Sequence, residues 1–443
     1  MEIKRILIAN RGEIALRALR TIKEMGKEAV VVYSTADKDA LYVKYADVAI
    51  CIGKERSSDS YLNIPAIISA AEISEADAIF PGYGFLSENQ NFVEICSHHK
   101  LKFIGPSVAA MALMSDKSKA KQVMQRAGVP VIPGSDGAVA DTKAAKELAK
   151  KIGYPVILKA AAGGGGRGMR VVEREEDIEK AFWSAESEAM SAFGDGTMYM
   201  EKYILNPRHI EVQIIGDSHG NVLHIGERDC SMQRRHQKLI EESPAILLDE
   251  ATRERLHETA IKAAKAIGYE GAGTFEFLVD KNLDFYFIEM NTRLQVEHCV
   301  SEMVSGLDII ELMIKVAQGE ALPPQESITL KGHAIECRIT AEDPNTFTPS
   351  PGKITKYVCP GGRNVRMDSH IYQDYSIPPY YDSMIGKLIV WDTDRNRAIH
   401  KMKVTLEQLI IGGIKTTRDF HIAMMENQDF IDNNYDTNYL ARH

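Results

Sequence analysis

Short apolar runs alternate with amphipathic stretches through the N-terminal part of the chain. Residues 6–9, 29–33 and 78–80 are apolar, residues 13–25 carry apolar side chains at spacings of three and four, and residues 62–71 form a second amphipathic stretch. Strands buried on both faces of a sheet have continuous apolar runs, and the helices that cover them have one apolar stripe. The alternation therefore predicts a parallel α/β sheet.

Similar patterns continue through the rest of the chain. After Gly332, segments rich in glycine and proline separate short strands that precede a final helix. The predicted helices are residues 142–152, 249–267, 307–318 and 397–409, and the predicted strands are residues 155–159, 169–172 and 198–203. We therefore expect a central α/β part and a small α+β part after the N-terminal sheet.

The charged side chains of the first predicted helix are spaced four residues apart. Glu13 precedes Arg17, and Arg20 precedes Glu24, at this spacing. Because residues four apart share one face of a helix, we interpret these charges as a solvated or interface face.

The strand, turn and helix at the N-terminus, with Asp37 after the second strand, suggest a dinucleotide-binding unit. Such a unit uses the three glycines of Gly-x-Gly-x-x-Gly for the turn, the approach of the pyrophosphate and helix packing. Only Gly12 is present in Asn10-Arg-Gly12. The sequence therefore argues against hydride transfer with a nicotinamide cofactor.

The composition is that of a globular protein. The 443 residues are 44% hydrophobic and 26% charged, with a formal net charge of -9. This acidic balance argues against a protein organised around nucleic-acid phosphates, and no apolar segment has the length of a membrane span. The six cysteines include no Cys-x-x-Cys pair, so neither a zinc site nor a disulfide framework is predicted. We expect a cytoplasmic protein with no nucleic-acid and no membrane partner.

One predicted strand ends in many polar groups, in the segment Glu289-Met-Asn-Thr-Arg-Leu-Gln-Val-Glu-His298. We predict a hairpin centred near Asn282, which pairs this strand with the apolar strand before it. In that hairpin Glu276 lies opposite Glu289, and Asn291 shares their face. Two carboxylates and an amide oxygen suit Mg²⁺ that holds substrate phosphates. A solvent-facing pair in a hairpin is the alternative.

A glycine run, Ala160-Ala-Ala-Gly-Gly-Gly-Gly-Arg-Gly-Met169, follows the strand that ends in Lys159. Successive glycines let backbone N–H groups approach phosphate oxygens, so the run predicts a cover over phosphates. It is not a Walker loop, because no Gly-Lys-Ser/Thr closes it. Lys159 and Lys117 could each offset phosphate charge. A flexible hairpin turn and surface lysines are the alternatives.

Two strand segments carry further candidate binding residues. Residues 228–238 are dense in cationic and titratable side chains and include Gln233, which suits an anionic substrate. His209 shares one strand face with Glu211 and Gln213. A core histidine with satisfied hydrogen bonds is the alternative for His209.

The segment Pro81-Gly-Tyr-Gly-Phe-Leu-Ser-Glu-Asn89 follows an apolar strand. Its glycines place Tyr83 at the carboxyl edge of the sheet, where open α/β folds bind ligands. Turn chemistry before an N-cap at Ser87 explains the segment equally well.

Five ordered motifs together resemble the biotin carboxylases of acetyl-CoA carboxylase, in the ATP-grasp superfamily. The motifs are Arg11-Gly-Glu-Ile-Ala15, residues 81–89, Gly163-Gly-Gly-Gly-Arg-Gly168, residues 227–238 and residues 289–298. The resemblance covers nearly the whole chain and implies an α/β ATP-grasp fold with an N-terminal Rossmann-like (pre-ATP-grasp) domain, a central lid subdomain and a C-terminal α+β domain. The implied boundaries are 1–115 for the N-terminal domain, 116–330 for the ATP-grasp domain with its lid at 131–204, and 331–443 for the C-terminal domain.

The resemblance also implies which residues bind substrates. ATP would contact Lys117, Lys159, Gly165, Gly166, Met169, Glu201, Lys202, Tyr203, Ile204, His209, Gln233, His236, Glu276 and Glu289, although Ile204 stands where the family often has leucine. Two Mg²⁺ ions, or Mn²⁺, would be held by Glu276, Glu289 and Asn291, in agreement with the hairpin argument. Bicarbonate would contact Lys238, Arg293, Gln295, Val296 and Glu297, with Glu297 as the base. Biotin would contact Tyr83 and Arg338.

The implied activity is ATP-dependent carboxylation of biotin through carboxyphosphate, the first half-reaction of acetyl-CoA carboxylase in fatty acid synthesis. Because the chain lacks an Ala-Met-Lys-Met attachment motif, we expect biotin on a separate carrier protein, together with separate carboxyltransferase subunits. A homodimer is expected through the face of Arg17, Arg20 and Glu24 and the region of Arg363, where family members often have an aromatic residue.

Three alternatives remain open. The chain could be the biotin carboxylase subunit of a pyruvate or propionyl-CoA carboxylase. Another ATP-grasp ligase, such as half of a carbamoyl phosphate synthase or a purine-pathway carboxylating enzyme, would share the glycine lid and the acidic metal pair. A non-catalytic ATP-binding subunit would not need Glu276, Glu289 and Arg293 together.

Overall fold

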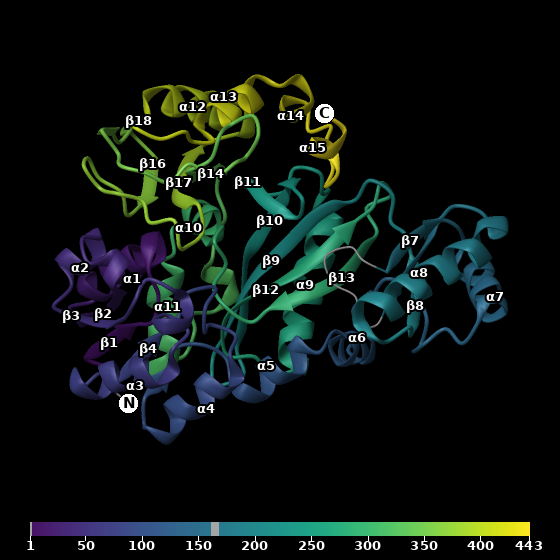
Figure 1. Cartoon of the computed structure of the whole chain (residues 1–443), viewed down its shortest axis with the longest axis horizontal. Helices are drawn as coiled ribbons and strands as arrows, with labels where there is room; N and C mark the ends of the chain where they lie inside the picture. The colour runs from purple at the N-terminus through teal and green to yellow at the C-terminus, as the bar shows by residue number, and fades with distance from the viewer. Residues whose placement is uncertain (1, 161–167) are drawn as a thin grey trace. The chain divides into compact units, whose positions relative to one another are not determined.

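The computed structural model describes residues 2–160 and 168–443 (Figure 1). The chain divides into two compact units. The body unit comprises Met1–Ala127, Arg208–Phe277 and Glu289–His443, and the lid unit comprises Gly128–Pro207 and Leu278–Ile288. Within the described ranges, no helix combines the length and the apolar character needed to cross a membrane.

Five parallel strands form the N-terminal sheet of the body unit, in the order β3-β2-β1-β4-β5. Their bounds are β1 Arg5–Ile8, β2 Glu28–Ser34, β3 Val48–Gly53, β4 Ala78–Phe80 and β5 Lys102–Phe103. Successive side chains of a strand point to opposite faces, so Ile6 and Ile8 join one hydrophobic cluster and Leu7 joins another. The parallel sheet predicted from the apolar runs is confirmed.

Helices and short 3-10 turns follow these strands. Their bounds are α1 Gly12–Glu24, η1 Thr35–Asp37, α2 Leu41–Tyr45, η2 Ser57–Asp59, α3 Ile64–Ile73, α4 Gln90–His98, α5 Val108–Ser115 and α6 Lys117–Arg126. The N-cap at Ser87, part of the alternative explanation for residues 81–89, is not found, because Asn89 caps α4 by accepting the Phe92 N–H at 2.9 Å. The backbone N–H of Ser87 instead donates to the Gly84 carbonyl at 3.0 Å.

The charged face predicted for α1 is largely buried. Glu13 is 3% exposed and Arg17 is 8% exposed, whereas Arg20 and Glu24 are exposed. The Arg17 guanidinium lies 3.0 Å from a carboxylate oxygen of Glu302 within the same chain. The solvated reading is therefore wrong for Glu13 and Arg17, because spacing along one helix does not show what packs against it. The interface reading stays a prediction.

The largest sheet among the described residues has eight strands, in the order β13-β12-β9-β10-β11-β14-β17-β16. Its strands are β9 Arg208–Gly216, β10 Val222–Arg234, β11 Gln237–Ser243, β12 Gly271–Val279, β13 Phe285–Asn291, β14 His333–Thr340, β16 Val365–Ser369 and β17 Met384–Asp392. Antiparallel pairing of Ile240 with Cys337 joins strands that are distant in sequence. Charged side chains from separate segments can therefore meet on one face.

Helices and one small sheet complete the body unit. Their bounds are α9 Glu250–Ala266, α10 His298–Ser305, α11 Ile309–Gln318, η4 Gln325–Ser327, β15 Lys356–Val358 paired with β18 Ile410–Gly412, α12 Arg395–Gln408, α13 Arg418–Glu426, α14 Gln428–Ile431 and α15 Tyr439–Arg442. Predicted helices 249–267, 307–318 and 397–409 correspond to α9, α11 and α12, and each end differs by two residues at most.

The described part of the lid unit contains a three-stranded antiparallel sheet in the order β7-β6-β8 and two α-helices. Its elements are α7 Thr142–Ile152, β6 Val156–Ala160, β7 Met169–Val172, η3 Glu175–Asp177, α8 Ile178–Phe193 and β8 Met198–Lys202. A separate core that includes Leu158, Phe182 and Met200 holds it together. The predicted bounds of α7 and β7 are confirmed at both ends.

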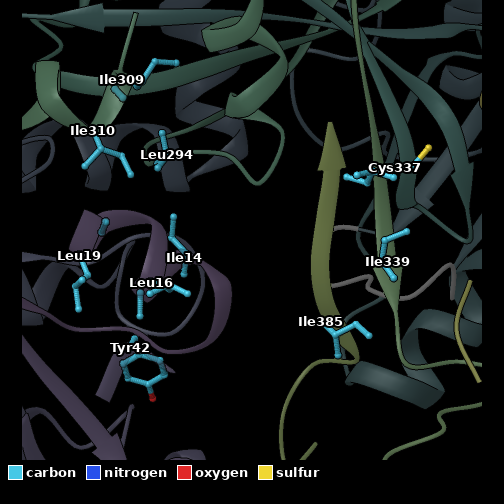
Figure 2. Close-up of a cluster of buried hydrophobic side chains, with 14 of the residues drawn as sticks. Ile14, Leu16, Leu19, Tyr42, Leu294, Ile309, Ile310, Cys337, Ile339 and Ile385 are labelled. Atoms are coloured by element: carbon cyan, nitrogen blue, oxygen red, sulfur yellow. The ribbon is translucent and has the colours of Figure 1, made fainter. Parts of the chain in front are cut away.

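The main core of the body unit joins elements that are far apart in sequence. Helix α1 packs against α11, and one cluster contains Ile14 and Leu19 of α1 with Ile309 and Ile310 of α11 (Figure 2). The same cluster reaches Cys337 of β14. Burial of apolar surface, worth about 25 cal/mol per Å², thus anchors the strands that carry the charged residues described next.

Candidate active site

Lys238 lies at the centre of a charged cluster in the body unit. Its Nζ is 2.6 Å from Glu211 Oε2, 2.6 Å from Glu297 Oε1 and 3.1 Å from Glu276 Oε1. Burial disfavours the ammonium charge, but the surrounding carboxylates raise the pKa of Lys238 well above its ordinary value. The cluster therefore keeps a permanent cation in a nearly dry site, where it can hold an anion.

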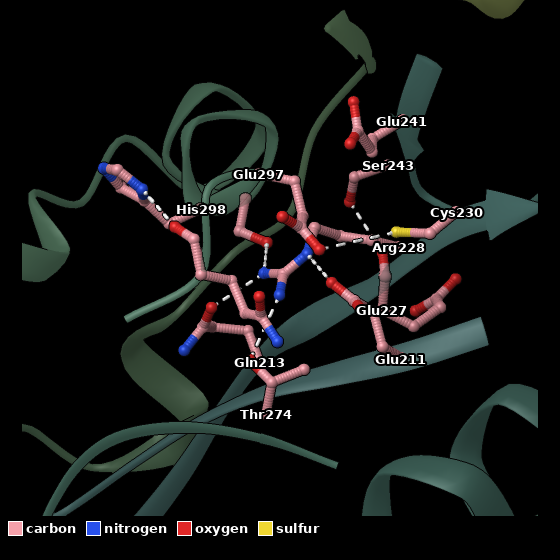
Figure 3. A network of polar contacts seen from close by, with 12 residues as sticks. Glu211, Gln213, Glu227, Arg228, Cys230, Glu241, Ser243, Thr274, Glu297 and His298 are labelled. Carbon is pink, nitrogen blue, oxygen red and sulfur yellow. Dashed lines mark hydrogen bonds and ion pairs between the residues drawn. The ribbon is translucent and has the colours of Figure 1, made fainter. Parts of the chain in front are cut away.

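Arg228 supports this cluster from inside the sheet. Its side chain is fully buried, and its Nε donates to Glu211 Oε1 at 2.6 Å (Figure 3). One of its Nη atoms donates to Gln213 Oε1 at 2.7 Å and to Ser301 Oγ at 3.0 Å, and the other donates to Thr274 Oγ1 at 3.2 Å. A buried guanidinium is stable only with such partners, so Arg228 fixes the orientation of Glu211 toward Lys238.

Glu297, the residue before α10, is shared by two cations. Its Oε1 faces Lys238, and its Oε2 lies 2.9 Å from an Nη of Arg338. Burial alone would raise the pKa of Glu297, but Lys238, Arg338 and Arg228 hold it well below the ordinary range. Glu297 is therefore ionised in this arrangement, and it becomes a stronger base when a ligand draws one of these cations away.

The segment after β13 is held by an acidic residue of the N-terminal loop. Thr292 donates through its backbone N–H and its hydroxyl to Glu88 Oε1, each at 3.0 Å, and Arg293 Nε donates to Glu88 Oε2 at 3.0 Å. The Arg293 guanidinium also donates to Asn291 Oδ1 at 2.9 Å and to Gln295 Oε1 at 3.1 Å. Arg293 is thus prepositioned beside the cluster around Lys238.

Two of the three predicted metal ligands lie together. Asn291 Nδ2 donates to Glu276 Oε1 at 2.8 Å, and His209 Nε2 lies 3.1 Å from Glu276 Oε2. Glu289 instead lies 3.2 Å from Lys117 Nζ. The donor atoms of the set are carboxylate and amide oxygens, the ligands that Mg²⁺ prefers, so these residues fit a magnesium site.

The hairpin that carries these ligands forms the predicted turn. The Asp280 N–H donates to the Asp284 carbonyl at 2.9 Å, and β12 and β13 are neighbours in the sheet. Leu283 has φ of 63°, in the left-handed region that tight turns use. The turn is confirmed, while the exact pairing of Glu276 with Glu289 stays a prediction.

A buried lysine joins two further predicted residues. Lys387 Nζ donates to the Val296 carbonyl at 2.8 Å and lies 3.3 Å from Glu13 Oε1. The hydroxyl of Tyr83 donates to Glu13, and the Tyr83 ring centroid is 6.0 Å from Lys387 Nζ. Lys387 therefore lies close to Tyr83, the predicted biotin contact, and to Val296, a predicted bicarbonate contact.

The predicted nucleotide residues of the lid unit lie on and beside its sheet. Lys159 Nζ and Glu201 Oε2 are 2.6 Å apart, and Lys202 Nζ donates to the Gly153 and Tyr154 carbonyls at 2.9 and 2.8 Å. The other described residues are Met169, 38% exposed, Tyr203, whose N–H donates to the Pro155 carbonyl at 3.0 Å, and Ile204, 9% exposed. Gly165 and Gly166 lie outside the described residues.

The remaining predicted residues lie on or beside the hairpin of β10 and β11. Gln233 is 7% exposed and pairs with Lys238 across the hairpin, whereas His236 is exposed at its tip. Arg235 and His236 have φ of 50° and 65°, a conformation that two-residue hairpin turns require. The turn therefore presents His236 to solvent close in sequence to Lys238.

Sequence reasoning missed several charged residues of this region. Glu88, Lys387, Glu241 and Glu336 received no role, although each contacts or faces a predicted residue or its partner. Arg228 was counted only within the segment that suits an anionic substrate. A lone charge within an apolar strand was the available signal, as at Lys387 in Met384-Ile-Gly-Lys-Leu-Ile-Val390. Burial of such a charge has a large free-energy cost unless the charge is paired, so it indicates a nearby partner.

Comparison with protein families gives three matches along the chain. Residues 2–111 match the family described as biotin carboxylase, N-terminal domain, and residues 336–442 match biotin carboxylase C-terminal domain. Residues 116–325 match the family described as carbamoyl-phosphate synthase L chain, ATP binding domain. The outer matches distinguish the chain from a carbamoyl phosphate synthase half.

Individual relatives agree over the full length. A biotin carboxylase of Nostoc sp. is 56% identical over 99% of this chain and 99% of its own. A crystal structure of a Campylobacter jejuni biotin carboxylase with a β,γ-ATP ligand is 84% identical, covers 100% of this chain and 99% of its own, and superposes with a TM-score of 0.93.

A third relative comes from a different carboxylase. The biotin carboxylase domain of 2-oxoglutarate carboxylase from Hydrogenobacter thermophilus, a dimer crystallised with MgADP, ADP and bicarbonate, is 49% identical, covers 100% of this chain and 98% of its own, and has a TM-score of 0.90. These likenesses show the predicted ATP-grasp fold. The chain belongs to the biotin carboxylase family.

Proposed function

We propose that this protein is an enzyme that carboxylates biotin with bicarbonate and ATP, giving carboxybiotin, ADP and phosphate. The observation that carries the proposal is the arrangement of Lys238, Glu297 and Arg338, which places a buried carboxylate between two cations whose side chains are each only 13% exposed. Family membership supports it, as do the matched structures that contain a β,γ-ATP ligand or MgADP with bicarbonate.

Bicarbonate would enter beside Lys238 and Arg293. Its negative charge competes with Glu297 for the Lys238 ammonium, so bicarbonate binding raises the pKa of Glu297 and turns it into a base. Gln295 and the backbone at Val296 would complete the site. Once Glu297 accepts the proton of bicarbonate, the freed oxygen attacks the γ-phosphate of ATP, which forms carboxyphosphate and releases ADP.

ATP would contact the described lid residues named above and, in the body unit, Lys117, His209, Gln233 and His236. Magnesium held by Glu276, Glu289 and Asn291 would neutralise phosphate charge when bound. Lys117 now pairs with Glu289 at 3.2 Å. We infer that nucleotide phosphates and metal replace this pair, which frees the lysine for phosphate.

Carboxyphosphate then breaks down to carbon dioxide and phosphate. The phosphate takes the N1 proton of biotin, Arg338 meets the negative oxygen of the ureido group, and N1 attacks carbon dioxide to form carboxybiotin. Tyr83 would contact the biotin ring. Because Arg338 holds both Glu241 and Glu297, it is oriented before biotin arrives.

The partners follow from the reaction. We propose that biotin arrives on a carrier protein and that a carboxyltransferase consumes carboxybiotin, with acetyl-CoA as the acceptor, in fatty acid synthesis. Pyruvate, propionyl-CoA or 2-oxoglutarate remains a candidate, because a matched structure belongs to a 2-oxoglutarate carboxylase. We retain the three-domain division as a proposal, and a homodimer through the exposed residues Arg20, Glu24 and Arg363.

The decisive test follows labelled bicarbonate into biotin and measures phosphate release from ATP with and without biotin. We expect phosphate release to depend on biotin and bicarbonate, and Arg338→Ala to lose carboxylation while it still binds ATP. An equal rate of phosphate release with and without biotin would favour another ATP-grasp ligase. ATP binding with no turnover would favour a non-catalytic subunit.

A further inference from the structure

Two buried glutamates face each other beside Arg338. Glu241 of β11 and Glu336 of β14 are directly opposite in the antiparallel register, and both are 0% exposed. Directly opposed residues have Cβ atoms about 4.5 to 5.5 Å apart, so like charges there repel strongly when water is excluded. The pair therefore cannot keep two full negative charges at low cost.

The hydrogen bonds of the pair are unequal. Arg338 Nε donates to Glu241 Oε1 at 2.6 Å. Neither oxygen of Glu336, nor Oε2 of Glu241, has a hydrogen-bond partner among the described residues. An ionised carboxylate with no donor is far more costly to bury than a protonated one, so the proton of the pair belongs on Glu336.

The surroundings of Glu336 exclude water. Ala334 and Glu336 lie on the same face of β14, and Ile389 is opposite Glu336 on β17. Ala334 and Ile389 pack in one apolar cluster with Val300 and Val304 of α10. Helix α10 thus covers the face of the sheet on which Glu336 lies.

The charges around the pair act in both directions. Burial raises the pKa of Glu336 well above its ordinary value and that of Glu241 to about 7. Lys387 favours the ionised form of Glu336, but it is already held by Glu13 and the Val296 carbonyl. The titratable and charged groups close to the pair are Lys387 of β17, Arg338 and Cys337 of β14, Lys238 of β11, Cys230 of β10, Glu297 before α10 and Cys299 of α10.

We propose that Glu241 and Glu336 are positioning residues for Arg338 and that the two share one negative charge. Glu241 orients the guanidinium. Glu336 stays protonated and does not form an ion pair with Arg338, so the guanidinium can interact with the ureido oxygen of biotin. The proposal rests on the proposed role of Arg338 in biotin carboxylation. When Glu336 ionises, a second carboxylate competes for Arg338 and draws it from Glu297 and from biotin.

The first test needs no activity. A carboxyl group whose pKa is raised by folding weakens the folded state as pH rises from its unfolded pKa to its folded pKa, because the folded state then binds more protons. Glu336→Gln removes this dependence, so its melting temperature relative to the native protein should increase as pH rises above 5. A constant difference over pH 5 to 9 would overturn the assignment of the proton to Glu336.

The second test uses steady-state kinetics of biotin-dependent ATP hydrolysis. Glu241→Gln should lower kcat by about 100-fold, as expected when a group is misplaced, raise KM for biotin and leave KM for ATP unchanged. Glu336→Gln should move the alkaline limb of the kcat profile to higher pH, because an amide cannot ionise. The exposed residue Glu407, which pairs with Lys403 on α12, provides the matched control Glu407→Gln.

The outcomes separate the two proposals. A native protein without biotin-dependent hydrolysis contradicts the proposed function, while the melting experiment still decides where the proton lies. If the native protein is active, equal rises in KM for ATP and biotin in Glu241→Gln would indicate general damage and overturn the positioning role. An unchanged pH profile in Glu336→Gln would overturn the role of its proton.

Discussion

The ionisable groups of the body unit and those of the lid unit are organised differently. Around Lys238, each carboxylate is buried and shared among several cations, so no single contact holds the site. In the lid unit, Lys159 and Glu201 are 2.6 Å apart with side chains 38% and 21% exposed, and Lys150 and Glu175 pair at 2.8 Å in open solvent.

This difference reflects what each region must do. Folding fixes the geometry of a buried charge network before bicarbonate and biotin bind. Removal of one member leaves another charge buried without its partner, which destabilises the fold. Exposed pairs are weak and easily exchanged. We infer that the exposed charges of the lid unit exchange their present ion pairs for contacts with a nucleotide, whereas the buried charges of the body unit take part in the reaction.

The largest expected effect tests the chemical side of this comparison. Glu297→Gln should lower kcat for biotin carboxylation by about 100-fold to 10,000-fold, the usual contribution of a general base, while ATP still binds in equilibrium titrations. Lys159→Gln, in the lid unit, should instead raise KM for ATP with a smaller change in kcat. If Lys159→Gln lowered kcat as much as Glu297→Gln and left KM for ATP unchanged, the division of roles would be wrong.

The next effect concerns stability. Arg228→Met should lower the free energy of unfolding by about 3–5 kcal/mol, because it removes the buried guanidinium that donates to Glu211 Oε1 and Gln213 Oε1. Denaturant unfolding of Lys150→Met, which removes an exposed pair of the lid unit, should scarcely differ from that of the native protein. Adding Glu211→Gln to Arg228→Met should restore part of the loss, and a purely additive double variant would contradict the network.

The smallest expected effect is the loss of folding stability at low pH that Glu227 causes. Glu227 lies 2.7 Å from His257 and 2.9 Å from Arg253. Although burial would raise its pKa, these partners lower the pKa of Glu227 to about 2. Its contribution to stability, about 3 kcal/mol by linkage, is complete above pH 4.5 and is lost as pH falls toward 2.

Unfolding free energies measured between pH 6 and pH 3 check this sign. The native protein should lose stability more steeply than Glu227→Gln over that range, so the two curves should converge in acid. Parallel curves would show that the acid sensitivity of the body unit has another source.

The sequence by itself determined the local elements and the kind of chemistry. Hydrophobic periodicity and the residues that flank each element identify helix 142–152 and strand 169–172 at their observed ends, because helix and strand periodicity are local properties. The acids and amide of residues 276–291 indicated an oxygen-rich metal site from alternation alone, and the ordered motifs indicated the family.

Only the tertiary structure decided which charges meet. Arg17 looked exposed along α1, yet it is buried against Glu302, more than 280 positions away. Glu241 and Glu336 are unremarkable in their own strands and become a pair only when β11 and β14 align. Strand order and helix packing depend on contacts between distant segments, which no local pattern encodes, and in this protein those contacts set the charge states of the site.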